Sequence, residues 1–360
     1  MINLYLENFN ILYFSNFVIG SIASFLFVYP INYFGIKYAL IDRLDSRKEY
    51  RDKIVRIGGL SIVLSFFLSI ILYQLINNVF SDNQLIYLLF YSTLFFFIGF
   101  FDDILAIKAI PRLILQISIS FAAWFFCSDL QFKFLDKVFT QNYLFDINLI
   151  LGIFITVIWI SGVTNAINWT DGLDGLASGI SIVVLIGLFF IFLTLDQYQY
   201  AFYSISLAGC CYGFFLQNYK PAKIIMGDGG AYFLGFNLAS LCLIASNKIM
   251  TLYPLNIYNV FLPFLLLTIP ILDMLVVILT RILNSRSPFQ PDRNHLHHKL
   301  LKNGYSYQKT LRIIIFLNLI FSFMTLLIFK SYSHILISTI IIFILNFFNK
   351  IKSFNFRKRF

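Results

Sequence analysis

The sequence predicts an all-α integral membrane protein with about eleven transmembrane helices in a single domain that spans residues 1–360. Its mean hydropathy is +0.81. Hydrophobic residues make up 59% of the chain and charged residues only 12%, whereas an ordinary soluble domain has about 25% charged residues. A water-soluble core cannot bury so much apolar surface, so lipid must be the solvent for most of this chain.

Apolar segments follow one another along the chain, and each is near the length of about 20 residues that crosses a bilayer as a helix. The predicted spans are 11–34, 58–79, 85–101, 112–127, 148–164, 176–194, 199–216, 230–245, 259–280, 310–329 and 334–349. The N-terminus lacks the basic segment and the cleavage site of a removable signal peptide. The four cysteines lie within apolar runs, and we expect buried thiols rather than disulfides or metal ligands.

The basic residues predict the orientation. If successive loops alternate between the two sides, 23 of the 27 Lys and Arg residues fall on one side and four on the other. Because basic loops remain in the cytoplasm, we expect the N-terminus outside and the C-terminus inside. Topology therefore explains the net charge of +10, and no nucleic acid is needed as a partner. The predicted cytoplasmic segments are 37–57, 102–112, 165–175, 217–229 and 281–309, with a basic tail at 350–360.

Polar motifs gather on this predicted cytoplasmic face. FDDIL ends the third span, NAINWTDGLDGLAS joins the fifth to the sixth, MGDGG begins the eighth, and HLHH follows the ninth. Their acids and histidines are Asp102, Asp103, Asp171, Asp174, Asp228, His295, His297 and His298. This convergence predicts an active site that faces the cytoplasm.

The residue types in these motifs indicate a chemistry. Neighbouring carboxylates on a partly dry surface repel one another unless a cation joins them. Oxygen ligands from several loops suit Mg²⁺ or Mn²⁺, and the sequence has no Cys/His set at zinc spacing. The glycines of DGLDG and GDGG let the backbone approach an anion, and the basic residues of 281–302 can donate to phosphate. These features predict phosphoryl transfer beside a membrane.

Each motif also has a purely structural interpretation. Asp102 and Asp103 can form a solvated helix end, DGLDG can be a calcium-like loop or a plain turn, and the histidines can pack an interfacial loop. Asp273 lies inside an apolar span, where an ionisable residue suggests function, but a polar seam with Arg281 two turns away explains it as well. We expect the acids of the outside loops to be solvated, namely Glu7, Asp82, Asp129, Asp136, Asp146 and Asp196.

Taken together and in order, the motifs resemble the polyprenyl-phosphate N-acetylhexosamine-1-phosphate transferases, the superfamily that contains WecA and MraY. RLDSRKEYRDKIVRIGG is similar to the family's first cytoplasmic loop, and FDDILAIKAIPRLILQ to its DD motif. NAINWTDGLDGLASG resembles N-x-x-N-x-x-D-G-x-D-G-L-A, and NYKPAKIIMGDGGAYFLGF resembles N-x-x-P-A-x-x-x-M-G-D-x-G-S. SPFQPDRNHLHHKL resembles S-P-F-x-x-D-R-x-H-x-H-H, the form of the WecA-like branch.

The resemblance implies an Mg²⁺-dependent reaction in a bacterial inner membrane. An oxygen of undecaprenyl phosphate attacks the β-phosphorus of a UDP-N-acetylhexosamine, releases UMP and leaves a sugar-diphospho-lipid for a cell-surface polysaccharide. N-acetylglucosamine is the preferred sugar, and UDP-GalNAc or a 6-deoxy-N-acetylhexosamine donor is the alternative. The resemblance leaves open whether the protein forms a homodimer. Outside this class, the alternative is a polytopic transporter, which places coupling carboxylates near the bilayer midplane.

The resemblance also assigns roles to residues. Asp228 and Asp103 are expected to hold the metal, and Asp102, Asp103, Asp171 and Asp174 to be catalytic. Substrate contacts are expected from Arg47, Lys48, Asn165, Asn168, Asn218, Arg293, His295, His297 and His298.

This sequence departs from the family pattern in two motifs. In the first loop, Leu44 replaces a proline, Tyr50 replaces a histidine, and no proline stands shortly before the glycine pair. Ala231 stands where the family usually has serine. These departures concern the contacts of that loop and the choice of sugar, and they leave the acidic residues intact.

Overall fold

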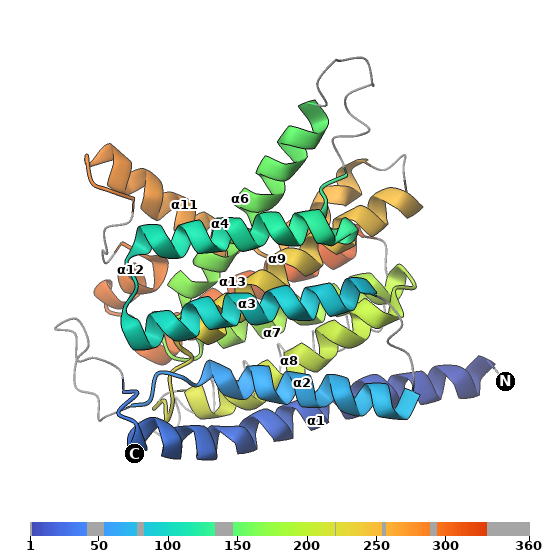
Figure 1. Cartoon of the computed structure of the whole chain (residues 1–360), viewed down its shortest axis with the longest axis horizontal. Coiled ribbons are helices and arrows are strands. Elements are labelled where there is room, and N and C mark those ends of the chain that lie inside the picture. The colour runs from blue at the N-terminus through green and yellow to red at the C-terminus, as the bar shows by residue number, and fades with distance from the viewer. Residues whose placement is uncertain are drawn as a thin grey trace.

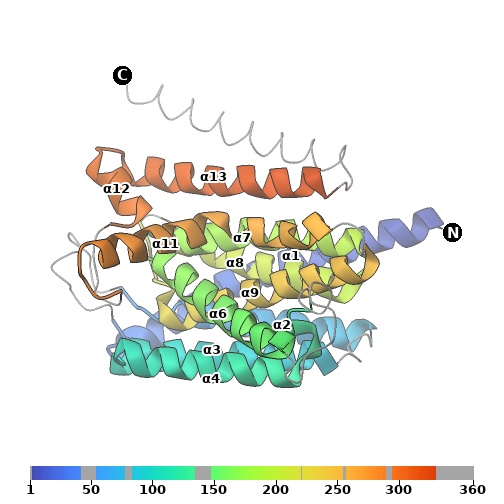
Figure 2. The same ribbon diagram turned by 90° about the horizontal axis from the view of Figure 1, so that it is seen from above.

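A computed structural model describes residues 2–41, 54–77, 83–133, 147–219, 221–253, 257–288 and 294–329. Within these ranges long helices lie side by side with their axes nearly parallel, and α6 crosses them obliquely (Figure 1; Figure 2). The helical elements are α1 (Ile2–Lys37), α2 (Gly59–Asn77), α3 (Asn83–Leu105), α4 (Ala109–Phe126), η1 (Ser128–Leu130), α6 (Ile147–Thr170), α7 (Leu176–Thr194), α8 (Tyr198–Asn218), α9 (Gly227–Leu252), η2 (Ile257–Phe261), α10 (Leu262–Leu265), α11 (Thr268–Leu283), α12 (Leu296–Lys302) and α13 (Tyr307–Ile328).

The predicted class, an all-α membrane protein, is confirmed. In the described part of the chain, seven helices are long and apolar enough to cross a membrane, or eight if one bent pair counts as a span. The ten predicted spans between residues 11 and 329 each coincide with a helix or with this bent pair. The span 334–349 lies outside the described residues, so the total of eleven stays a prediction. All four cysteines are buried thiols, as expected.

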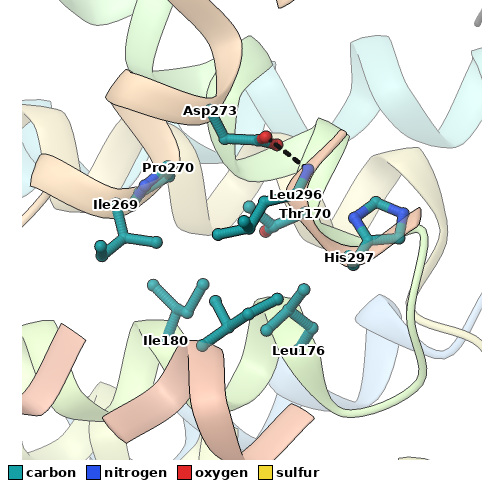
Figure 3. A pocket seen from close by; sticks show the side chains of 9 residues that line it. Thr170, Leu176, Ile180, Ile269, Pro270, Asp273, Leu296 and His297 are labelled. Atoms are coloured by element: carbon teal, nitrogen blue, oxygen red, sulfur yellow. Dashed lines mark hydrogen bonds between the residues drawn. The ribbon is translucent and has the colours of Figure 1, made fainter. Parts of the chain in front are cut away.

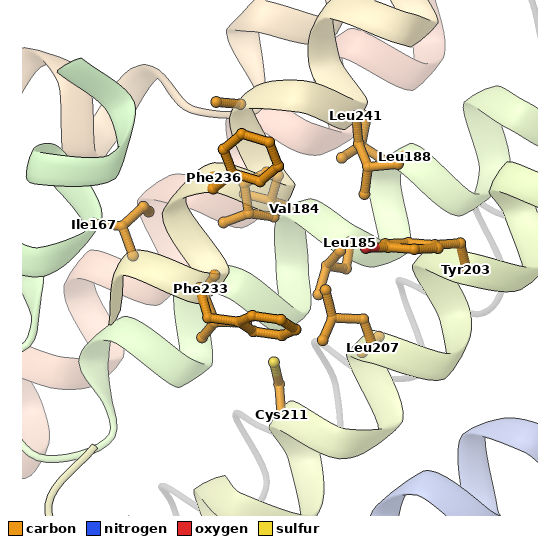
Figure 4. Close-up of a cluster of buried hydrophobic side chains, with 14 of the residues drawn as sticks. Ile167, Val184, Leu185, Leu188, Tyr203, Leu207, Cys211, Phe233, Phe236 and Leu241 are labelled. Carbon is orange, nitrogen blue, oxygen red and sulfur yellow. The ribbon is translucent and has the colours of Figure 1, made fainter. Parts of the chain in front are cut away.

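The central helix is α9, whose most apolar stretch is completely buried. It packs against α2, α3, α6 and α7. Phe233 and Phe236 extend from α9 into a cluster that includes Val184, Leu185 and Leu207 of α7 and α8 (Figure 4). A helix that is apolar and buried on all sides has no face for solvent or lipid. The first turn of α9 is therefore enclosed by the ends of other helices.

Small residues bring α3 and α6 close to α9. A Cβ atom on Gly99 of α3 would overlap with the backbone of Asp228. A Cβ atom on Gly235 of α9 would lie 2.5 Å from the Cα of Thr164 in α6. Small residues at helix crossings in membranes permit this close backbone approach. These contacts place the C-terminal end of α3 beside the N-terminal end of α9.

The predicted span 259–280 is broken into two pieces. Asn259–Leu265 and Thr268–Leu283 meet at a bend of 73°. Pro263 and Pro270 lie in the first turns of α10 and α11, where proline is tolerated, although it cannot continue an existing helix. The chain then passes through α12 to α13, which lies along one side of the bundle (Figure 2).

Asp129 forms a polar cluster at the end of the bundle where α4 and α9 finish. Its carboxylate lies 3.2 Å from Nζ of Lys248 and accepts a 2.6 Å hydrogen bond from the hydroxyl of Tyr200. The expectation that Asp129 is solvated is wrong, because α8 and α9 bring a hydroxyl and a cation to it. Asp196 is exposed, as expected. The other acids of the predicted outside loops lie outside the described side chains, namely Glu7, Asp82, Asp136 and Asp146.

Candidate active site

Three segments bring the predicted acids together at the other end of the bundle, which lies at the left in Figure 1, where α3 turns into α4. Asp102 and Asp103 stand in the last turn of α3, and Asp228 stands in the first turn of α9. Asp171 and Asp174 lie in the turn between α6 and α7. The close packing of α3 on α9 therefore joins motifs that are more than a hundred residues apart.

Asp103 caps the central helix. Its Oδ1 accepts a hydrogen bond from the backbone N–H of Asp228 at 3.0 Å, and its Oδ2 accepts one from Gly229 at 3.1 Å. A carboxylate is favourable at this position because the first N–H groups of a helix lack internal partners. Gly227 has a φ of +75°, and a Cβ atom there would lie 2.5 Å from Oδ2 of Asp103. Glycine at this position lets the carboxylate reach the helix end.

Asp228 lies at the centre of the acidic cluster. Its Oδ1 accepts a 2.7 Å hydrogen bond from Nδ2 of Asn168. Its Oδ2 lies 3.3 Å from Nη2 of Arg56 and 3.9 Å from Nη1 of Arg112. One carboxylate thus contacts an amide and two guanidinium groups that come from three different segments.

Arg56 reaches this cluster from the short connection before α2. Two β-bridges hold that connection, one between Ile41 and Val55 and one between Val55 and Ile224. The backbone of Val55 is therefore fixed between the end of α1 and the segment that leads into α9. From this position Nε of Arg56 lies 2.9 Å from Oδ1 of Asp103.

A second polar group extends from α4. Nη1 of Arg112 contacts Oδ2 of the buried Asp102, and its guanidinium carbon lies 5.8 Å from the ring centroid of Tyr232. One turn further along α4, Oε1 of Gln116 accepts a 2.7 Å hydrogen bond from Nδ2 of Asn165. Asn165 therefore links α6 to α4, whereas Asn168 faces Asp228.

The turn between α6 and α7 is held by its backbone. The N–H of Gly175 donates to Oδ1 of Asn218 at 2.8 Å, and Nδ2 of Asn218 donates to the carbonyl of Ile224 at 2.8 Å. The N–H of Asp174 donates to the hydroxyl of Tyr307 on α13. Asn218 thus uses both ends of its amide to hold the acidic turn against the segment that leads into α9.

Burial, together with the charges of Asp228 and Asp174, raises the pKa of the Asp171 carboxyl well above its usual range. The Asp171 side chain lies near enough to Arg56 for that cation to oppose the rise. The Asp171 carboxyl in this turn is therefore close enough to Asp228 to be influenced by its charge.

The histidine motif forms the start of α12 and packs on the acidic turn. A Cβ atom on Gly172 would lie 2.7 Å from Nε2 of His297. Burial and the neighbouring His298 and His295 lower the pKa of His297 to about 3, so this imidazole is neutral at physiological pH. The centroids of the His297 and His298 rings are 4.2 Å apart. The three histidines thus form a compact group beside the turn.

The predicted substrate residues Arg47, Lys48 and Arg293 lie outside the described residues. Sequence reasoning missed Arg56, which stood among several basic residues of one loop, and gave Arg112 and Gln116 no role. Asp273 was left open between function and a seam with Arg281; instead it contacts His295 and the backbone of Leu296. The one available signal for Asp273 was its charge inside an apolar helix.

The residues fit a hard divalent cation bound partly by substrate. Among the described residues, no three His, Cys, Asp or Glu side chains stand close enough together to hold a metal ion by themselves. Mg²⁺ is usually bound by one or two carboxylates, with water and phosphate oxygens completing its shell. Burial and, after it, the charge of Asp228 raise the pKa of Asp171, and a divalent cation beside the two carboxylates would oppose this rise.

Comparisons with known proteins show which proteins this chain is similar to. A family model described as "Glycosyl transferase family 4" matches residues 85–246, from α3 into α9. A probable undecaprenyl-phosphate N-acetylglucosaminyl 1-phosphate transferase of Bacillus subtilis is 30% identical over 92% of this chain and 89% of its own length. A decaprenyl-phosphate N-acetylglucosaminephosphotransferase of Mycobacterium leprae is 38% identical over 45% of this chain and 44% of its own.

A phospho-N-acetylmuramoyl-pentapeptide-transferase of Prochlorococcus marinus is 33% identical over 70% of this chain and 73% of its own length. Similarity thus extends to both named branches of the superfamily that the motifs resemble. The similarity to the Bacillus protein extends over nearly the whole of both chains. The chain therefore belongs to glycosyl transferase family 4, the WecA/MraY superfamily.

Proposed function

We propose that this protein transfers N-acetylglucosamine 1-phosphate from UDP-N-acetylglucosamine to undecaprenyl phosphate at the cytoplasmic surface of a bacterial inner membrane. The observation that carries the proposal is the set of acids and two arginines enclosed where membrane-length helices end. A lipid phosphate and a water-soluble nucleotide can meet at such a surface. The names of the Bacillus and Mycobacterium relatives support the sugar and the polyprenyl phosphate acceptor.

The reaction is an exchange at phosphorus. An oxygen of the lipid phosphate forms a bond to the β-phosphorus of the donor, and the bond from that phosphorus to the bridging oxygen of the α-phosphate breaks. UMP leaves with the bonding electron pair. A phosphate monoester is largely a dianion at neutral pH, because its second pKa is about 6. Little deprotonation is needed, so we favour direct attack over a covalent aspartyl-phosphate.

Asp228 and Asp171 are the residues that we assign to Mg²⁺, which when bound supplies positive charge to the phosphate oxygens of the donor. The sequence-based choice of Asp103 as second ligand is less favoured, because both Asp103 oxygens accept N–H groups of α9. Asp103 then acts by holding the first turn of α9 and with it Asp228.

The two arginines are the fixed cations of the proposed reaction. Arg56 lies between Asp103 and Asp228, and Arg112 lies between Asp102 and Asp228. When phosphate enters, each guanidinium can exchange a carboxylate oxygen for a phosphate oxygen in the same planar geometry. Charge that develops on the transferred group is thereby met by groups that are already in place.

A transporter is disfavoured because the motif acids lie at helix ends rather than at midplane breaks. The donor can be tested with purified protein, Mg²⁺ and undecaprenyl phosphate, offered UDP-GlcNAc, UDP-GalNAc and a UDP-6-deoxy-N-acetylhexosamine. We expect UMP release and a lipid product of the GlcNAc mass. A preference for one of the other two sugars would identify that sugar as the donor instead. If none of the three sugars gave a product, the proposed function would be refuted.

Replacement of Asp228 tests the centre of the site. Asp228→Asn keeps the shape and an oxygen for Asn168 but removes the charge. We expect UMP release to fall by about 10²–10³-fold, as for loss of one preorganised charge-stabilising group, with an unchanged gel-filtration profile in detergent. A folded variant that releases UMP at the wild-type rate would contradict the role of Asp228.

A further inference from the structure

Asp273 is the acid that the apolar composition of α11 leaves unexplained. The neighbouring side chains Leu272, Leu275 and Val276 are exposed on this helix, as expected for a lipid-facing surface. A carboxylate in such a helix is costly unless it is paired. The role of Asp273 can therefore be inferred from its contacts.

Both oxygens of Asp273 are committed to the start of α12. Oδ1 accepts a 2.7 Å hydrogen bond from the backbone N–H of Leu296, drawn in Figure 3. Oδ2 lies 2.9 Å from Nδ1 of His295. Because a carboxylate only accepts, Nδ1 of His295 must carry the hydrogen in this contact. Asp273 thus fixes the position of the first histidine and also which ring nitrogen is protonated.

Arg281, two turns further along α11, secures the chain that leads to the histidines. Its guanidinium donates to the carbonyl of Pro288 and lies 4.9 Å from the ring centroid of Trp169. Trp169 in turn makes an edge-on contact with the ring of His295, with centroids 5.3 Å apart. Asp273 and Arg281 therefore do not pair with each other; each holds a different part of the segment between α11 and α12.

The surroundings of Asp273 and of the start of α12 are largely apolar. A small, partly open pocket lies between α7, α11, α12 and α13, and Asp273 and His297 line it together with Ile180, Ile269 and Leu296 (Figure 3). In this apolar setting, Asp273 supplies two polar contacts to the start of α12.

We propose that Asp273 is a positioning residue that orients His295 and presents its second ring nitrogen, Nε2, as a hydrogen-bond acceptor to a hydroxyl or N–H group of the nucleotide donor. The inference rests on the proposed function, since the donor is the ligand for which His295 is oriented. A carboxylate that holds an imidazole in one tautomer is a recurrent device in both metal sites and hydrolases. Here the carboxylate that orients the imidazole is that of Asp273 on α11, a helix that carries no other motif residue.

Kinetics of Asp273→Ala provide the first test. We expect the KM for the UDP-sugar to rise by roughly 10–100-fold, the range found when carboxylate partners of metal-bound histidines are removed, with the KM for undecaprenyl phosphate unchanged. Asp129→Asn is the matched control, a paired carboxylate at the opposite end of the bundle, and both KM values should stay at the wild-type level. Equal increases in both KM values of Asp273→Ala would overturn the proposal.

Nitrogen-15 NMR of the imidazoles provides a test that does not depend on activity. The chain has four histidines, and His295→Gln identifies the signals of His295. In the wild type we expect a hydrogen on Nδ1. In Asp273→Asn the new amide can accept from Leu296 and donate to Nδ1, so the hydrogen should move to Nε2.

The two tests separate this inference from the proposed function. An unchanged His295 spectrum in Asp273→Asn would refute the orienting role even in an active enzyme. The opposite result is also informative. If the hydrogen moved as expected in Asp273→Asn but the wild type accepted no UDP-sugar, the proposed function would be refuted, and the donor could not be the ligand of His295.

Discussion

Arg56 gives positive charge to two carboxylates of the candidate active site, at 2.9 Å from Asp103 and 3.3 Å from Asp228. Removal of one partner of such a pair leaves a partly buried charge without compensation. We therefore expect Arg56→Gln to lower the melting temperature of the detergent-solubilised protein in EDTA. Added Mg²⁺ should restore part of the loss, because a cation beside Asp228 replaces the missing charge.

Arg286→Gln is the matched control for this measurement. Arg286 is exposed after the end of α11, and exposed charges away from specific contacts change stability little. Its melting temperature should equal that of the wild type with and without Mg²⁺. If Arg56→Gln behaved in the same way, the charge balance described for the cluster would be wrong.

His297 makes the stability of the protein depend on pH. Its pKa is lowered to about 3 in the folded protein, whereas an unfolded histidine titrates near pH 6.5. Between these values the unfolded chain binds a proton that the folded chain does not, so the free energy of unfolding decreases as pH falls below about 6.5. His297→Gln cannot titrate, so its melting temperature should fall less than that of the wild type between pH 7 and about 5. Equal slopes for the two proteins would contradict this account.

At the scale of the helices, Gly99 permits the crossing that assembles the site. A Cβ atom there would overlap with the backbone of Asp228, which cannot move aside as a flexible side chain can. Overpacking costs about 1–3 kcal/mol, which exceeds the gain of about 1 kcal/mol from alanine in a helix. We expect Gly99→Ala to lower both the melting temperature and the rate of UMP release, because it displaces Asp228 from Asp103.

Gly162→Ala in α6 controls for the substitution itself. A Cβ atom at that position would lie 3.9 Å from Cε of Met274, an ordinary contact distance. The melting temperature should be unchanged or slightly raised, and the rate of UMP release unchanged. Similar losses in both variants would mean that close packing at Gly99 has no special importance.

The helices were predictable from hydropathy because lipid burial requires a continuous apolar segment of fixed length. Hydropathy does not indicate where a helix bends. The single predicted span 259–280 therefore missed the 73° bend between α10 and α11. Pro263 and Pro270 were the available signals, since proline cannot continue a helix. The bend matters because it carries Asp273 to the start of α12.

The site was predictable in its acids and only partly in its cations. Asp102, Asp171 and Asp228 stood out because carboxylates are rare in an apolar chain. Arg56 did not stand out, because it is one of several basic residues in the same loop. All of them fit the rule that basic loops remain in the cytoplasm. The distinction of Arg56 comes from the β-bridges of Val55, which are tertiary contacts that no local pattern contains.

At the scale of the whole molecule, the structure has two polar ends separated by apolar helices. One end holds the acids of the candidate active site with Arg56 and Arg112. The other holds Asp129 paired with Lys248. Because the helices between them are of membrane length, the two ends should lie on opposite sides of a bilayer, and the basic loops predict that the candidate active site faces the cytoplasm.

This orientation is open to direct measurement with single cysteines. Lys108 is exposed between α3 and α4 at the active-site end, and Asp196 is exposed after α7 at the other end. We expect a membrane-impermeant maleimide to label Asp196→Cys on intact spheroplasts, and Lys108→Cys only after permeabilisation. The four native cysteines are buried and provide an unlabelled background. Labelling of Lys108→Cys alone on intact spheroplasts would invert the proposed orientation, and labelling of both would show that α7 does not separate these sites.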